Sequence, residues 1–252
     1  MPEASPDVAD HDVLRTLRTH WDVDVDAVER LPLGGRSLHW RADERGAPQL
    51  FVTARALGGT DQEVVGGLEA LEAAQAGAGH LAFAVDGVVA GLPRATGGYV
   101  AGLRGPASGF GVTAAPWVWG EPVEDPPRDR TEVEALTRLL MRLHRAAPPP
   151  SVRHWRPRTR TQLPDEAWTE RYLDLAERAR ARPLVPTHGA PHAAHRMRAP
   201  TGRLLLTGWS GLLLAPVERD LRHLVRAGAE HLVDVDAGLL ELFDLEAHLD
   251  PE

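Results

Sequence analysis

The feature that most constrains the fold of this chain is a change of periodicity about halfway along it. Before residue 115, apolar and polar residues alternate in several short segments, whereas after residue 130 apolar residues recur every three or four positions. The charged, proline-rich stretch "EPVEDPPRDR" (121–130) separates the two patterns. We therefore expect an α+β chain with a β-rich part, residues 1–115, and a mostly helical part, residues 116–252.

In the first part, the patterns predict two helices and a set of strands. Residues 10–20 have helical spacing with Asp10 or Asp12 as the N-cap, and residues 61–76 form the longer, inserted helix. We expect Glu63, Glu69 and Glu72 to lie on its solvated face. The expected strands are 21–33 around Val23 and Val25, 38–43 and 48–57 as a hairpin, and 80–85, 99–105 and 109–119.

In the second part, Thr131 and Glu134 form a capping box that begins a helix running to about residue 146. A loop over 147–164 follows, and a second helix begins at Asp165. A strand over 204–209 is expected to form a hairpin with the stretch around His195–Arg198. Helices over 217–228 and 235–249 close the chain.

Composition excludes several classes of function. The 252 residues include no cysteine, so the chain has no disulfide, thiolate nucleophile or cysteine-bound metal. The formal net charge of −8 argues against a nucleic-acid partner, whose phosphates need a basic surface. No apolar run approaches a membrane span, and the acidic start is no signal peptide, so we expect a cytoplasmic protein without a membrane partner.

The stretch "VPTHGAPHAAHRM" (185–197) holds three histidines and no acidic residue. Imidazoles at this spacing could bind Zn²⁺ or Cu²⁺, although Gly189 and Pro191 interrupt any helix that would align them. A hydrolase would need a nucleophile, and "GWSG" (208–211) does not fit the Gly-x-Ser-x-Gly pattern. The arginine-rich segment 153–160 is either a solvated loop or a contact for an anionic ligand.

Several stretches, in order, resemble the aminoglycoside phosphotransferase-like family, particularly the branch of spectinomycin phosphotransferase. They are "LPLGGRSLHWRADERGAPQLFVTA", "LTRLLMRLH", "HGAPHAAHRM" and "LLLTGWSGLLLAPVERDL". The resemblance covers nearly the whole chain. It implies a two-lobed protein-kinase-like fold, with residues 1–115 as the N-lobe and residues 116–252 as the C-lobe.

The loop 187–197 keeps only part of the family's His-Gly-Asp-x-His-x-x-Asn pattern. His188, Gly189 and His192 match it. By the resemblance, the family's catalytic aspartate falls on Ala190, and its metal-binding asparagine falls on His195.

The next stretch departs from the family in the same way. Trp209 matches, but the metal-binding aspartate before it falls on Gly208 and the acid after it on Ser210. The segment "ERDL" (218–221) matches the start of a helix that holds the scaffold. The strand lysine that would bind nucleotide phosphates is absent, because the chain has no lysine, and Ala54 or Arg55 stands at its place.

These departures affect the chemistry directly. Mg²⁺ prefers oxygen ligands, and neither Ala190 nor Gly208 has a side-chain oxygen, while the nitrogen of His195 is a poor exchange. Abundant Ala, Arg, Gly and Pro indicate a GC-rich genome, which accounts for missing Lys and Asn but not for the missing aspartates. We therefore expect no catalytic residue and no metal site, no required cofactor and no Mg²⁺, while ATP binding stays open.

Ligand-binding candidates follow from the resemblance, which implies a small-molecule or protein ligand in the inter-lobe cleft. Two roles stay open for the candidate residues. They could form a turn over nucleotide phosphates or another ligand contact, or they could serve ordinary turn or hinge packing. The candidates are Gly34, Gly35, Arg55, Pro116, Trp117, Val118 and Ser210.

Three functions are compatible with these residues. The first is a pseudokinase that binds a ligand or partner without transferring phosphate. The second is an active ATP-dependent phosphotransferase acting on an aminoglycoside or aminocyclitol, similar to antibiotic-resistance enzymes. The third is an interaction scaffold without enzyme activity.

Overall fold

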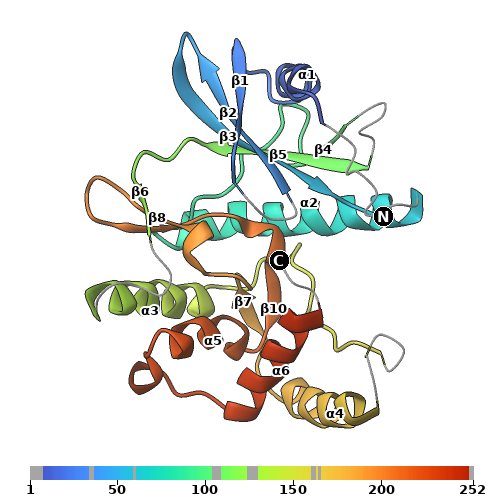
Figure 1. Ribbon diagram of the computed structural model, residues 1–252, viewed down its shortest axis with the longest axis vertical. Coiled ribbons are helices and arrows are strands. Elements are labelled where there is room, and N and C mark those ends of the chain that lie inside the picture. Colours follow the sequence, from blue (N-terminus) through green and yellow to red (C-terminus); the bar gives the residue numbers. More distant parts are fainter. Residues whose placement is uncertain are drawn as a thin grey trace. The chain divides into compact units, whose positions relative to one another are not determined.

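The computed structural model describes residues 8–33, 37–58, 61–103, 109–123, 130–159, 163 and 166–249 (Figure 1). The described residues form six α-helices and three small β-sheets, which confirms the predicted α+β class. The chain divides into two compact units: unit 1 is 1–79 with 89–119, and unit 2 is 80–88 with 120–252. The boundary expected between residues 115 and 116 remains a prediction.

Unit 1 contains an antiparallel five-stranded sheet in the order β1-β2-β3-β5-β4. The predicted hairpin is confirmed as β2 and β3, which pair from Ser37 opposite Arg55 to Glu44 opposite Ala47. The strands are β1 (Ala27–Leu31), β2 (Ser37–Glu44), β3 (Ala47–Ala56), β4 (Ala101–Gly102) and β5 (Phe110–Pro116).

Helix α1 (Asp10–His20) packs with one face of this sheet, as the alternation of the strands requires. Val13 and Leu17 of the helix lie in one apolar cluster with Trp40 and Val52 of the strands, all essentially inaccessible to solvent. The expected N-cap is wrong, because Ala9 occupies that position. The carboxylate of Asp10 instead accepts a 2.7 Å hydrogen bond from Nε1 of Trp40, which ties the helix to the sheet.

Helix α2 (Asp61–Ala84) is longer than predicted, and the strand expected over 80–85 is wrong. The reason is visible in the spacing of buried residues, which continues at three and four positions to the end of the helix. Alanine, abundant in this stretch, also favours helix. The buried positions are Leu71, Ala74, Ala78, Leu81 and Val85.

Two further expectations need correction. The strand expected over 21–33 is present only as β1, and residues 22–26, which include Val23 and Val25, are not a strand, although Val25 is buried. Glu72 is not solvated: its carboxylate accepts hydrogen bonds of 2.8–2.9 Å from the backbone N–H groups of Tyr99 and Val100. The carboxylate thus accepts the backbone N–H groups that lead into β4. The sequence argument missed this role because it considered only a lysine as a partner for Glu72, and the chain has no lysine.

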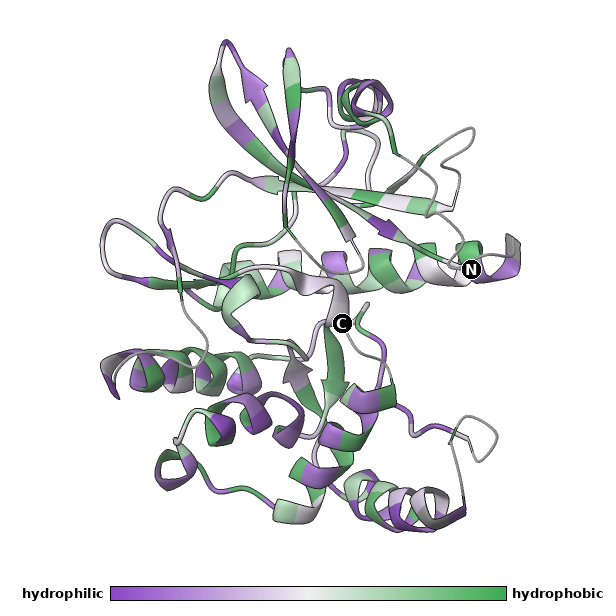
Figure 2. Cartoon of the chain, in the orientation of Figure 1, coloured by the Kyte–Doolittle hydropathy of each residue, from purple (hydrophilic) through white to green (hydrophobic). Residues whose placement is uncertain are grey.

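Unit 2 contains the remaining helices, and their apolar faces supply its core. In Figure 2, α3 shows alternating apolar and polar stripes, and the apolar stripe contains the buried Leu136, Leu140 and Leu143. The predicted capping box is wrong, because Thr131 lies inside α3 and Glu134 binds Arg130 at 2.8 Å. The helices are α3 (Arg130–Arg145), α4 (Glu166–Arg180), α5 (Glu218–Arg226) and α6 (Ala237–Leu249).

Two small sheets in unit 2 frame the loop that the sequence singles out. The predicted hairpin is confirmed as β8 (Arg196–Arg198) and β9 (Leu204–Leu206), with β6 (Glu121–Pro122) on the far side of β8. The pairing of β7 (Val185–Thr187) with β10 (Leu213–Ala215) was not predicted, because three-residue strands carry almost no periodic signal.

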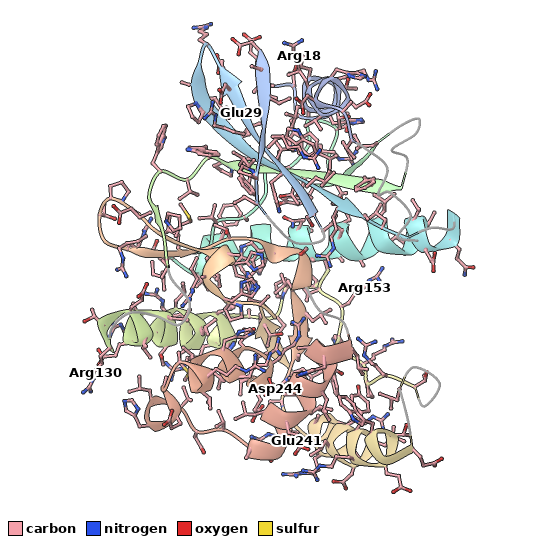
Figure 3. The ribbon with its side chains drawn as sticks, viewed as in Figure 1. Arg18, Glu29, Arg130, Arg153, Glu241 and Asp244 are labelled. Carbon is pink, nitrogen blue, oxygen red and sulfur yellow. The ribbon has the colours of Figure 1, made fainter. Side chains whose placement is uncertain are left out.

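Ion pairs fix α6 against its neighbours in unit 2 (Figure 3). Glu241 pairs with Arg171 of α4, and Asp244 pairs with Arg226 of α5 at 2.8 Å. A search of the described helices finds none with the length and apolar character needed to span a bilayer.

Candidate functional site

The loop between β7 and β8 is anchored by one buried carboxylate, that of Asp220 in α5. Its Oδ2 accepts the backbone N–H of His188 at 2.9 Å, and its Oδ1 accepts that of Gly189 at 2.6 Å. Nε2 of His144 in α3 lies 3.0 Å from the same Oδ2. A helix, a loop and a second helix therefore meet at this carboxylate.

The electrostatics of Asp220 follow from these contacts. Burial alone raises the pKa of a carboxyl group, because the charged form loses its hydration. Here the hydrogen bonds from His144 and from the backbone of Gly189 outweigh burial and hold the pKa of Asp220 well below its usual range. The carboxylate is charged, and both of its oxygens are occupied by donors.

His188 is a buried, neutral histidine with both ring nitrogens used. Nδ1 accepts the N–H of Ala190 at 3.2 Å, so Nε2 carries the proton and donates to the carbonyl of Thr207 at 2.7 Å. Burial, followed by the neighbouring His195, lowers the pKa of His188 to about 3. The side chain is completely inaccessible and holds the loop against the segment that follows β9.

Two arginines of α5 also contact the loop. Nη1 of Arg219 donates to Oγ1 of Thr187 at 3.0 Å, and Nη2 of Arg222 reaches the carbonyl of Gly189 at 3.4 Å. Gly189 has φ +94°, and an ideal Cβ there would lie 2.6 Å from Cζ of Arg219. The positive φ favours glycine at this position, and a side chain there would have to displace the guanidinium of Arg219.

The positions that the resemblance assigns to catalysis and metal binding are brought together here. The methyl group of Ala190 is buried, with 4% of the residue exposed. Nδ1 of His195 lies 2.8 Å from the carbonyl oxygen of Ala190, and since a carbonyl can only accept, Nδ1 is the donor. The ring of His195 lies directly beside Gly208.

Rings of four residues form a chain through the loop. His188 packs edge-on against Trp209, with ring centroids 4.6 Å apart, and lies 5.4 Å from His195. His192 stacks on His195 at 4.7 Å with an interplanar angle of 29°. Among the residues that the structure describes, no group of three or more His, Asp or Glu side chains is arranged to hold a metal ion, so the metal-site alternative gains no support.

The ligand-binding candidates of unit 1 are only partly described. Gly34 and Gly35 lie outside the described residues. In β3, Ala54 is buried in the apolar cluster, whereas Arg55 is half-buried and belongs to the opposite face of the strand. Of the two, only Arg55 presents a side chain outside the core.

The stretch after β5 carries a row of rings. Its backbone is held by the N–H of Trp117, which donates to the carbonyl of Gln49 at 2.8 Å. The ring of Trp117 lies 6.4 Å from Phe51 and 6.4 Å from the exposed Trp119. Pro116 is exposed and Val118 is half-buried. These positions stay predicted ligand contacts of unit 1.

Ser210 belongs to unit 2 and is half-buried in a single 3₁₀ turn, Trp209–Gly211. Its role as a ligand contact likewise remains a prediction.

The sequence argument missed residues that complete the site. His144 lies one turn after Leu140 on the buried face of α3, so its spacing on an apolar stripe was the available signal. His223 of α5 also faces the loop, its ring 6.1 Å from that of His192. Burial in the first place, and then the charge of Arg222, lower the pKa of His223 to about 4.

Comparison with known proteins identifies the fold. No family model matches the sequence, and no curated protein matches it. Solved structures of small-molecule phosphotransferases do match it, along nearly all of its length and at 10–17% identity, which shows a shared fold. The chain has the aminoglycoside phosphotransferase-like, protein-kinase-like fold, as the resemblance predicted.

Three solved structures illustrate the similarity. Spectinomycin phosphotransferase APH(9)-Ia with ADP and spectinomycin superposes with a TM-score of 0.65 at 13% identity, covering 96% of this chain and 86% of that one. Amicoumacin kinase hAmiN with AMP-PNP, Ca²⁺ and Ami gives 0.65 at 10% identity, covering 96% and 84%. The microcompartment-associated aminopropanol kinase gives 0.65 at 14% identity, covering 95% and 86%.

Proposed function

We propose that this protein is a pseudokinase of the aminoglycoside phosphotransferase-like fold, which binds a small-molecule ligand and does not transfer phosphate. One observation carries the proposal. At the loop 187–197 the imidazole of His195 lies beside Gly208, at the two positions where the resemblance places metal ligands. The loop keeps its anchoring contacts and has no carboxylate facing a reacting group.

The residues present do not fit a magnesium ion. Mg²⁺ requires near-octahedral oxygen coordination, usually with one or two carboxylates, and supplies the charge that stabilises phosphoryl transfer. Ala190 and Gly208 have no side-chain oxygen, and both oxygens of the nearby Asp220 are engaged by His144 and backbone N–H groups. A nitrogen of His195 is the wrong donor type for this ion.

Ligand binding without transfer is supported by a difference within the site: the contacts that hold the loop are present, whereas ligands for a magnesium ion are not. The groups that shape the loop are present and well ordered by contacts, namely Asp220, His188, Arg219 and Arg222. Solved relatives of the same fold are bound to ADP, AMP or AMP-PNP. A nucleotide or a related small phosphorylated molecule is therefore the ligand class that we propose, with the half-buried Arg55 as a cation for its phosphates.

An active phosphotransferase is the second candidate. It is favoured by the TM-scores of 0.65 to three proteins described as a phosphotransferase or kinases. In that case metal and base would come from side chains other than Ala190, His195 and Gly208. Phosphate transfer itself decides between the two candidates.

The test is a melting titration with ATP, with and without Mg²⁺, followed by measurement of phosphate transfer from radiolabelled ATP. The acceptor panel includes spectinomycin and 1-amino-2-propanol, and spectinomycin phosphotransferase serves as the positive control. We expect ATP to raise Tm equally with and without Mg²⁺, with no labelled product above background. At a nucleotide concentration 100 times Kd, the stabilisation is about 2.7 kcal/mol.

Two outcomes contradict the proposal. Mg²⁺-dependent stabilisation together with labelled product identifies an active enzyme. No stabilisation by nucleotide at millimolar concentration removes nucleotides as the ligand class and favours the interaction scaffold. Replacing Arg55 by Gln should weaken the Tm shift that ATP produces, because it removes the positive charge proposed to meet the phosphates; the Tm of this variant without ligand serves as its own reference.

A further inference from the structure

The β8–β9 hairpin determines what lies beside residue 208. Its last paired residues are Arg196 opposite Leu206, and one residue beyond them the N–H of Thr207 donates to the carbonyl of His195 at 2.9 Å. The register therefore carries His195 across to the start of the turn that begins at Gly208. The contact between the two residues is a consequence of the hairpin, which both strands hold in place.

The ring of His195 is held in this position by three neighbours. Nδ1 donates to the carbonyl of Ala190 at 2.8 Å. One side of the ring stacks on His192 at 4.7 Å, and His188 lies 5.4 Å away. The ring is thus fixed by a hydrogen bond to the loop and by packing within it.

Gly208 leaves no room for any side chain while the ring is there. An ideal Cβ at Gly208 would overlap Cδ2 of His195 and would lie 2.8 Å from Nε2 and 2.9 Å from Cγ. Carbon atoms in van der Waals contact are about 3.5–4.0 Å apart, so the ring would have to leave its position. Moving it would break the hydrogen bond to Ala190 and the stack on His192.

We propose that His195 is a steric plug: its half-buried imidazole occupies the space that a side chain of residue 208, or a ligand held by it, would need. Positions 195 and 208 are consequently coupled in size, and the loop is closed at this point by its own residue. The inference deepens the proposed function. It rests on that function only in taking residue 208 as the position where the resemblance places a metal ligand. Its steric content stands on the distances alone.

The coupling can be measured with a matched control that the chain provides. Gly208 has φ +75° and Gly202 has φ +81°, so alanine carries similar backbone strain at both positions. An added Cβ at Gly202 meets nothing within 4 Å. The difference between the two alanine substitutions therefore isolates the contact with His195.

The experiment compares Tm for Gly202→Ala and Gly208→Ala, each in the native protein and in a His195→Ala background. We expect Gly202→Ala to lower Tm by about 3 °C in both backgrounds. In the native protein, Gly208→Ala should lower Tm by about 8 °C, since the clash adds to the strain. In the His195→Ala background the loss at Gly208 should shrink to about that at Gly202.

Equal losses for Gly208→Ala in both backgrounds would overturn the plug, because removal of the ring would then have relieved nothing. If His195→Ala does not fold, His195→Ser replaces it, since serine has no atoms where Cδ2 and Nε2 of the ring lie. As an independent readout, the Cδ2–H resonance of His195 should shift in Gly208→Ala and stay unchanged in Gly202→Ala. An unchanged resonance in both variants also counts against the plug.

Failure of the inference and failure of the proposed function are separable. Phosphate transfer by the native protein, together with a positive coupling between positions 195 and 208, would leave the plug in place and remove the pseudokinase. Absence of transfer, together with no coupling between the two positions, would remove the plug and leave the pseudokinase in place.

Discussion

The carboxylate of Asp220 does more for the loop than any other side chain described. It accepts two backbone N–H groups and contacts the ring of His144, all within a region without solvent access. Such a carboxylate is difficult to replace, because its removal leaves several buried donors without an acceptor. At this scale the structure shows a loop whose backbone is held by one buried carboxylate.

Asp220→Asn tests that dependence. The amide can accept through only one oxygen and would direct its NH₂ group at buried donors, so we expect a loss of about 3–5 kcal/mol in the free energy of unfolding. Urea denaturation followed by circular dichroism measures it. Asp24→Asn, an exposed carboxylate of unit 1, is the control and should change the free energy by less than about 0.5 kcal/mol.

Two neutral histidines make stability depend on pH. Burial lowers the folded-state pKa of His188 to about 3 and that of His223 to about 4, whereas the unfolded chain binds these protons near pH 6.5. The unfolded state therefore gains protons first as the pH falls. Stability is complete above about pH 6.5 and declines toward pH 4 and 3, by about 2 kcal/mol per histidine between pH 6.5 and 5.

The measurement is the urea midpoint at pH 7.5 and at pH 5. His223→Asn should reduce the difference between the two midpoints, because it removes one of the two groups whose pKa is lowered by burial. A midpoint that rises on acidification would mean that these rings are protonated in the folded protein.

At the scale of elements, short polar contacts join segments that periodicity alone cannot connect. Glu72 of α2 holds the backbone of Tyr99 and Val100, and Glu246 of α6 accepts hydrogen bonds from Trp155 and from Tyr172 of α4. In each case a helix supplies a carboxylate to groups far away in sequence. Burial raises the pKa of Glu246, and the two donors oppose that shift.

Glu72→Gln tests the first of these contacts. The amide offers a single acceptor oxygen without charge to two backbone donors, so we expect a loss of about 1–3 kcal/mol in the free energy of unfolding. Glu170→Gln, at an exposed position of α4, should cost less than about 0.5 kcal/mol. Amide hydrogen exchange at Tyr99 and Val100 should speed up only in the Glu72 variant.

At the scale of the whole molecule, charge limits the partners that we expect. The formal net charge is −8, and the arginines of the segment 153–160 form a local concentration of positive charge. A nucleic-acid site needs a continuous basic surface that releases counterions. The cytoplasmic location and the absence of a nucleic-acid partner remain predictions.

Titration with labelled duplex and single-stranded DNA at 150 mM salt tests this expectation. We expect no change in fluorescence anisotropy up to about 100 μM protein. Any affinity for DNA would then be lower than that of most non-specific DNA-binding proteins. Replacement of Arg153 and Arg156 by Gln serves as a comparison. Saturable binding that these substitutions remove would show that the arginine-rich loop contacts phosphates.

The sequence alone determined the fold class, the β2–β3 and β8–β9 hairpins and most helices, because these follow from local periodicity and turn residues. It also singled out the loop 187–197, since its three histidines and its lack of acidic residues are read directly. It failed where signals compete: residues 80–85 alternate like a strand but continue the buried spacing of α2, and three-residue strands are too short to register.

Only the tertiary structure decided which residues meet. Asp220 and His144 are far apart in the chain, so no local pattern links them. The predicted hairpin brings the segments of His195 and Gly208 together, but only the structure gives the distance between the ring and the glycine. Burial set the protonation of His188, because desolvation depends on everything packed around a ring and not on its neighbours in sequence. The residue types came from the sequence, and their distances, which decide what the loop can bind, came from the fold.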